Sequence, residues 1–170
     1  MVQRYRTILK WALYGAGLLL VMLLNTVVLG SRTFLGTKLS LVPVYTACVA
    51  CREGHESGCC FALAAGLAWA LSGAEGGAAF VLMLPLAAVP AGYFPSTYLT
   101  RTLLPALGGC LLTLVLCEGA VFLQRLYMGA ALPANAPALL GLQIGFSLIP
   151  APLFWWLTRL IGKAGGSHGA

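Results

Sequence analysis

Aspartate is absent from this chain of 170 residues, and other charged residues are scarce. Glu, Lys and Arg together make up only 8% of the sequence, against roughly 25% charged residues in ordinary soluble domains. A soluble fold of this size needs a charged surface that the chain does not possess. The missing aspartate also excludes a Ser/His/Asp triad, and the glycines form neither a GxGxxG pattern nor a P-loop. The composition therefore excludes a soluble enzyme and a disordered tail protein.

Hydrophobic residues are plentiful instead, at 60% of the chain. One bilayer crossing takes about 20 apolar residues, so the length suffices for about six crossings with short loops. The net charge of +6 comes from basic residues scattered singly at the ends of apolar runs, whereas a nucleic-acid-binding patch needs them clustered. We therefore expect an all-α integral membrane bundle of about six transmembrane helices, which contacts membrane lipid and binds no nucleic acid.

Apolar runs predict where the six spans lie. They are residues 11–29, 34–51 or 39–51, 58–71, 78–94, 103–123 and 138–161, with loops at 31–38, 52–57, 72–77, 95–102 and 127–137. If the second span starts at residue 39 it is only ~20 Å of helix, so it must start earlier or lie partly at the interface. Pro85 and Pro90 are expected to kink the fourth span. The first apolar run is too long for a signal peptide, so we expect a retained span.

The distribution of Lys and Arg predicts the orientation. Basic residues favour the cytoplasmic side of a membrane, and with six spans seven of them fall on the side of the N-terminus and three on the other side. The first set is Arg4, Arg6, Lys10, Arg52, Arg101, Arg159 and Lys163, and the second is Arg32, Lys38 and Arg125. We expect one multi-pass domain over residues 1–170, with residues 1–10 as a cytoplasmic N-terminus and residues 164–170 as a flexible cytoplasmic tail.

The six cysteines lie within or beside apolar runs. Cys48 and Cys51 form a CxxC, and a zinc site with the following His55, Cys59 and Cys60 can be imagined, but such sites usually have two pairs at finger spacing. Buried free cysteines that act as small hydrophobes are the alternative. A zincin motif fails because the position four residues after His55 is Cys59 rather than histidine. We therefore predict no catalytic residue, no metal site and no cofactor.

Small residues recur at four-residue spacing in two predicted spans. In lipid, small residues on one helical face let two backbones approach closely. We therefore predict helix-packing or partner-contact faces at Gly58, Ala62, Gly66 and Ala70 in the third span, and at Gly109, Thr113 and Cys117 in the fifth.

Glu118 is the sharpest anomaly within a predicted span. A charged side chain at the bilayer centre costs about 2.5–3.5 kcal/mol on insertion scales. Glu118 could serve a proton relay, contact a ligand or hydrogen-bond to another helix, or it could reach the interface with the help of Arg125. Asn25 and Gln143 are amides in the first and sixth spans that can hydrogen-bond across helices. The sequence leaves these alternatives open.

Short motifs follow one another along the chain from about residue 10 to residue 163. They are Leu24-Asn25-Thr26, Leu41-Val42-Pro43, Arg52-Glu53-Gly54, Gly58, the run Gly-Leu-Ala-Trp-Ala-Leu-Ser-Gly at residues 66–73, Tyr98-Leu99-Thr100-Arg101, Glu118, Gln143, and an aromatic and basic ending at residues 152–163. In this order they resemble the family of the bacterial rod-shape-determining protein MreD. The chain departs from the family at Ala70, where relatives have Asp, and its Ser-Gly is one residue shorter than their Ser-Ser-Gly.

The resemblance implies a non-enzymatic scaffold or regulator of bacterial cell shape and peptidoglycan elongation, placed in the plasma membrane. Its implied partners are the bitopic protein MreC, the actin-like MreB, and the SEDS-type polymerase with its transpeptidase. The family is also similar in fold to the six-helix substrate-binding components of energy-coupling-factor vitamin transporters. The alternative is therefore a small-molecule-binding membrane subunit that needs a separate ATPase. Small-residue stripes and few polar residues favour the scaffold.

Overall fold

The computed structural model describes residues 2–28, 39–73, 76–97, 103–129 and 135–164, and within these ranges it contains helices and turns but no strand. The helices are α1 (Val2–Leu23), which continues into a π-helical segment η1 (Leu24–Val28), α2 (Leu41–Glu53), α3 (His55–Leu71), α4 (Gly77–Thr97), α5 (Leu103–Tyr127), α6 (Ala136–Leu148) and α7 (Ala151–Ala164). Within these described ranges, three stretches are long and apolar enough to cross a membrane: Tyr5–Val27, Leu103–Tyr127 and Ala136–Lys163. The chain is therefore an all-helical protein with helices suited to a bilayer.

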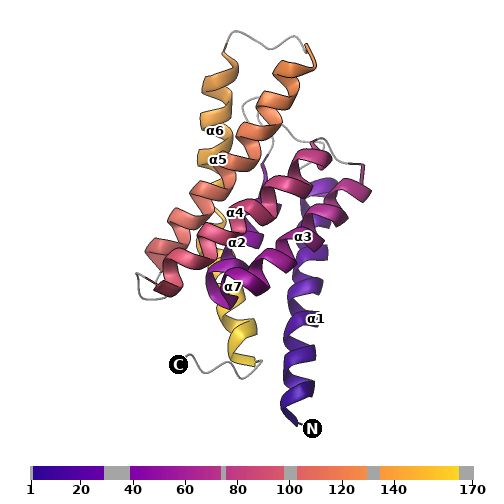
Figure 1. Ribbon diagram of the computed structural model, residues 1–170, viewed down its shortest axis with the longest axis vertical. Helices are drawn as coiled ribbons and strands as arrows, with labels where there is room; N and C mark the ends of the chain where they lie inside the picture. The colour runs from indigo at the N-terminus through magenta and orange to yellow at the C-terminus, as the bar shows by residue number, and fades with distance from the viewer. Residues whose placement is uncertain (1, 29–38, 74–75, 98–102, 130–134, 165–170) are drawn as a thin grey trace.

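Successive helices from α1 to α6 run in alternating directions, and α7 continues in the direction of α6 (Figure 1). The N-terminal end of α1 and the C-terminal end of α7 lie at the same end of the molecule, whereas α5 ends and α6 begins at the opposite end. Gly92 in α4 lies so close to the break between α2 and α3 that an added Cβ would overlap the backbone of Gly54 and His55. The end of α4 therefore packs beside the end of α2.

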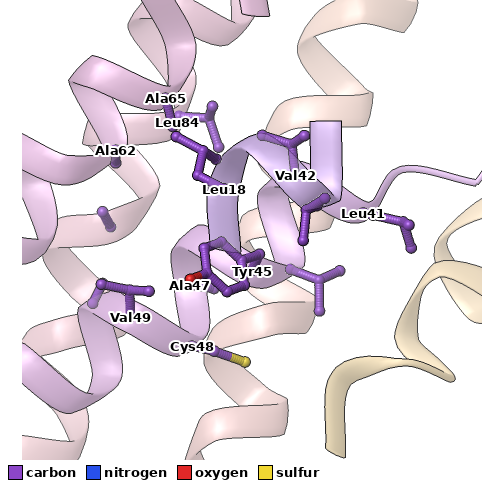
Figure 2. Close-up of a cluster of buried hydrophobic side chains, with 14 of the residues drawn as sticks. Leu18, Leu41, Val42, Tyr45, Ala47, Cys48, Val49, Ala62, Ala65 and Leu84 are labelled. Carbon is purple, nitrogen blue, oxygen red and sulfur yellow. The ribbon is translucent and has the colours of Figure 1, made fainter. Parts of the chain in front are cut away.

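Helix α2 occupies the centre of the bundle. Every residue from Leu41 to Cys51 is buried, as expected for a helix that is hydrophobic on all sides. The core around it includes Leu18 of α1, Ala62 and Ala65 of α3, and Leu84 of α4 (Figure 2). Pro43 is tolerated because it lies in the first turn, where backbone N–H groups have no partner within the helix. The two ends of α2 are therefore held at fixed places among the other helices.

One predicted boundary is wrong. The expected loop at residues 52–57 is a break at the single residue Gly54, whose φ of 93° lies in the region that favours glycine. The expected span at residues 138–161 falls within Ala136–Lys163, one of the stretches suited to a membrane, but its helix is divided into α6 and α7 by a turn at Ile149 and Pro150. Proline has no N–H to donate, and its ring clashes with the carbonyl four residues earlier.

Other boundaries differ less. Helix α1 begins at Val2, ahead of the predicted start at residue 11, and α4 runs through Pro85 and Pro90 as one helix. The predicted loop at residues 31–38, the motif at residues 98–101 and the tail beyond residue 164 lie outside the described residues.

Candidate functional site

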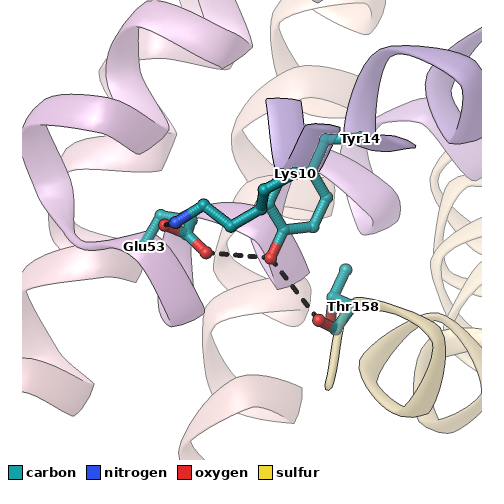
Figure 3. A network of polar contacts seen from close by, with 4 residues as sticks. All are labelled: Lys10, Tyr14, Glu53 and Thr158. Carbon is teal, nitrogen blue, oxygen red and sulfur yellow. Dashed lines mark hydrogen bonds and ion pairs between the residues drawn. The ribbon is translucent and has the colours of Figure 1, made fainter. Parts of the chain in front are cut away.

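A polar cluster lies at the C-terminal end of α2, where α1 and α7 meet it (Figure 3). The Lys10 ammonium lies 2.6 Å from Glu53 Oε2, and the Tyr14 hydroxyl donates to Glu53 Oε1 at 2.9 Å. Both carboxylate oxygens of Glu53 thus have a partner on α1. The side chains of Lys10 and Glu53 are only 12% and 10% exposed, so this ion pair ties α1 to α2 in a setting shielded from water.

Two phenols extend this cluster to a third helix. The Tyr14 hydroxyl also lies 3.4 Å from the carbonyl of Thr158 on α7, and the Tyr45 hydroxyl donates to the carbonyl of Tyr14 at 3.1 Å. Gly17 makes this approach possible, because a Cβ there would overlap the Tyr45 hydroxyl. The Tyr45 ring packs edge-on against Phe154 of α7 at 5.7 Å. The cluster therefore joins α1, α2 and α7.

The charges at this end match the dipole of α2. The C-terminus of a helix carries a partial negative charge, which cations stabilise. Arg52 in the last turn of α2 and Lys10 beside it supply positive charge there. Glu53 has the unfavourable sign for this position, and its ion pair with Lys10 offsets that cost.

A second polar cluster lies at the N-terminal end of α2. Gln143 Nε2 on α6 donates to Glu118 Oε2 on α5 at 2.6 Å, and Ser40 makes a side-chain hydrogen bond with the same carboxylate. The backbone N–H of Ser40 donates to Ser147 Oγ at 2.9 Å. The carboxylate thus lies at the positive end of the α2 dipole.

The structure therefore brings together two residues that the sequence singled out separately, Glu118 and Gln143. Glu118 is buried among the helices, and Arg125 is exposed in the last turn of the same helix. Of the alternatives for Glu118, the geometry matches a hydrogen bond between helices. Ser40 caps α2, whereas Glu118 lies on α5 and Gln143 on α6. The hydrogen bonds of Glu118 therefore position these three helices relative to one another.

The small-residue stripe of α3 faces two neighbouring helices. A Cβ at Gly58 would overlap Ala50 of α2, and a Cβ at Gly66 would lie 2.9 Å from the carbonyl oxygen of Phe80 on α4. Ala62 is fully buried, and Ala70 abuts Gly77 of α4. This stripe is used for packing within the chain.

The stripe of α5 is also used internally. A Cβ at Gly109 would lie 3.0 Å from the Cys51 sulfur of α2 and 3.3 Å from Cβ of Ala91 on α4. Thr113 and Cys117 are buried on the same face, and the Thr113 hydroxyl donates to the Gly109 carbonyl at 2.8 Å. Both stripes thus let neighbouring backbones approach α2 or α4.

Asn25 and the cysteines take separate positions. Asn25 lies in the π-helical segment, and its Oδ1 is buried without a hydrogen-bond partner among the described residues. Cys48 points to Cys110, with 3.5 Å between the sulfurs, while Cys51 donates to the Ala91 carbonyl. Over the described part of the chain, no group of three or more His, Cys, Asp or Glu is placed to hold a metal ion.

Sequence reasoning missed the Lys10, Tyr14 and Glu53 cluster. Lys10 and Tyr14 are four residues apart and hence share a helical face, but Glu53 was assigned to a loop. Since α2 extends through Glu53, the carboxylate is held against α1 instead. Tyr14, a residue with a polar hydroxyl within the long apolar run, was the feature of the sequence that could have indicated a polar contact between helices.

Each of the two clusters holds a carboxylate that binds groups on other helices. Their chemistry is hydrogen bonding and ion pairing between helices, at opposite ends of a helix about 20 Å long. No family model, curated protein or solved structure matches this chain. A function must therefore be inferred from these contacts and from the motif resemblance.

The close approach of α3 to α4 predicts the effect of enlarging Gly66. Gly66→Leu should lower the melting temperature, because overpacking of this kind costs about 1–3 kcal/mol or more. The measurement is thermal unfolding in detergent, followed by tryptophan fluorescence. Gly108→Leu is the matched control, since a Cβ at Gly108 meets no atom within 4 Å. Equal melting temperatures for the two variants would contradict tight packing at Gly66.

The bond between Glu118 and Gln143 predicts different effects for an amide and an apolar replacement. Glu118→Gln keeps an acceptor and should leave stability nearly unchanged, whereas Glu118→Leu leaves the Gln143 amide without this partner. In a double-mutant cycle with Gln143→Leu we expect a coupling near 0.6 kcal/mol, with ~1.7 as the upper end for such contacts in membrane proteins. Strict additivity of the two single variants would contradict the contact.

The shielded ion pair predicts that single charge removals are worse than a double one. Lys10→Met leaves Glu53 with an uncompensated charge, and loss of one partner of a buried pair costs about 3–5 kcal/mol. The double variant Lys10→Met/Glu53→Leu should recover most of that loss, because apolar replacement of a whole buried pair is often neutral. Unfolding curves of Lys10→Met, Glu53→Leu and the double variant in one detergent check this. A double variant weaker than either single variant rules the prediction out.

Proposed function

We propose that this chain is a non-enzymatic membrane scaffold of the bacterial cell-elongation machinery, of the MreD type. One observation carries the proposal: residues of the resembling motifs coincide with contacts between helices. Glu53, in Arg52-Glu53-Gly54, pairs with Lys10 on α1, and Gly54 forms the break between α2 and α3. Glu118 and Gln143 bond to each other between α5 and α6. Motif positions that hold helices together suit a protein whose role depends on its shape.

We further infer six crossings of the bacterial plasma membrane with both termini in the cytoplasm. The alternating directions of α1 to α6 and the shared location of the start of α1 and the end of α7 support an even number of crossings (Figure 1). Helix α2 is short for a bilayer core of about 30 Å, but its enclosure by other helices removes the need to match the lipid. The turn at Pro150 makes α6 and α7 one interrupted crossing.

The packing of the interior favours a scaffold over a small-molecule-binding subunit. A ligand-binding subunit needs a cavity lined by convergent polar groups, whereas α2 fills the middle of this bundle with buried apolar side chains. The outer helices present wide apolar faces, since only 17% of the apolar stretch in α1 and in α6 with α7 is buried. Such faces suit lipid and the single span of MreC, with MreB and the SEDS polymerase and transpeptidase as further members of the complex.

Co-purification with the MreC of the same genome tests the proposal. We expect MreC to co-elute with this chain in mild detergent, and an unrelated single-span protein not to do so. Deletion of this chain should turn rod-shaped cells round. If the deleted cells keep their shape and an energy-coupling ATPase is recovered in the same purification, the scaffold proposal is contradicted and the transporter-subunit alternative is supported.

Photo-crosslinking locates the contact on the bundle. A crosslinking residue at Leu20 of α1 or at Leu153 of α7, which are 57% and 63% exposed, should give an adduct with MreC from one of these faces. The same residue at the fully buried Leu84 is the control and should give none. An adduct pattern that does not distinguish Leu84 from the exposed positions contradicts docking on an outer face.

A further inference from the structure

We propose that Arg52, Arg159 and Lys163 form a binding site for the headgroup of an anionic phospholipid at the C-terminal end of α7. The site lies at the end of the molecule where α1 begins and α7 ends (Figure 1). Arg52 belongs to a motif named for the scaffold proposal, but the contacts that carry that proposal are made by Glu53, Glu118 and Gln143, so the lipid site can be tested independently of that function.

Arg52 brings a positive charge from α2 to the last turns of α7. Its guanidinium lies directly against Gly162, where a Cβ would overlap it. Its Nε is buried and has no hydrogen-bond partner within the described ranges. The neighbouring Glu53 carboxylate accepts hydrogen bonds from Lys10 and Tyr14 instead. Arg52 as a whole is half-buried, and a guanidinium is a group that suits phosphate oxygens.

Arg159 and Lys163 add two exposed cations beside Gly162. They are four residues apart and therefore share one face of α7. The Arg159 guanidinium lies over the Trp155 ring, 5.4 Å from its centroid, and this stacking presents the planar group in a fixed position. Guanidinium groups bind phosphate through paired N–H donors, and Lys adds a point charge. Three cations thus gather around two turns of one helix.

The surroundings favour a lipid over a free anion or an acidic protein segment. Trp156 is 59% exposed, and Leu153 and Leu160 are exposed further along the same helix. Tryptophan is enriched at the level of lipid headgroups, so the apolar face of α7 can take acyl chains while the cations take the phosphate. Basic pockets between membrane helices bind anionic headgroups in this way.

Lipid competition in detergent tests the site. The purified chain, stripped of lipid, is mixed with phosphatidylglycerol or phosphatidylcholine, and bound lipid is counted by native mass spectrometry alongside the melting temperature. We expect phosphatidylglycerol to be retained and to raise the melting temperature more than phosphatidylcholine does. Arg159→Gln should weaken phosphatidylglycerol binding about fivefold, the value of one cation near a charged surface.

Controls separate this site from general charge effects. Arg125→Gln removes one cation from the last turn of α5, at the end of the molecule opposite to the proposed site. This variant should leave phosphatidylglycerol binding within twofold of the wild type. Equal weakening by Arg125→Gln and Arg159→Gln overturns the proposal, as does equal retention of the two lipids. Inorganic phosphate and a polyglutamate peptide serve as further probes. If either displaces phosphatidylglycerol at equal concentration, the site belongs to a free anion or to an acidic protein segment instead.

Discussion

Enclosure of α2 is the constraint on which the rest of the structure depends. Lipid tails are as apolar as the side chains of this helix, so burial of apolar surface gives it little reason to prefer protein neighbours. Close contact has to supply the preference. Gly58 and Gly109 let α3 and α5 approach α2 closely, and Gly66 lets α3 approach α4. The glycines and alanines of α3 and α5 are thus the counterpart of the bulky, fully buried residues of α2.

Directional contacts complement this packing at each end of α2. At the positive pole of the helix Ser40 is hydrogen-bonded to Glu118 and Ser147, and at the negative pole Lys10 neutralises Glu53. Small-residue packing sets how close two helices lie, but it only weakly resists their sliding along one another. A bond between specific atoms at each end fixes the axial position of α2. Small-residue packing therefore sets the distance of α2 from its neighbours, and the polar contacts at its ends set its axial position.

The helical class and the packing stripes could be predicted from the sequence, because both follow from composition and from four-residue spacing. The contact partners could not. Gln143 and Glu118 were each recognisable as polar groups in apolar runs, but their pairing depends on how α5 and α6 lie side by side. The break at Gly54 was missed because a polar run reads as a loop, although one glycine with positive φ suffices to turn the chain. The turn at Pro150 was missed because a proline within an apolar run does not by itself decide whether a helix ends, as Pro85 and Pro90 within the continuous α4 show.

The central place of α2 has a consequence for how the chain is made. Its neighbours include α1, synthesised before it, and α5 and α7, synthesised after it. When α2 leaves the ribosome, more than half of the surface that will enclose it does not yet exist. Until α7 has been synthesised, α2 lacks part of its final packing partners, so the core can be completed only after the last helix is made. Loss of α7 from the C-terminus would therefore damage the centre of the protein rather than its edge.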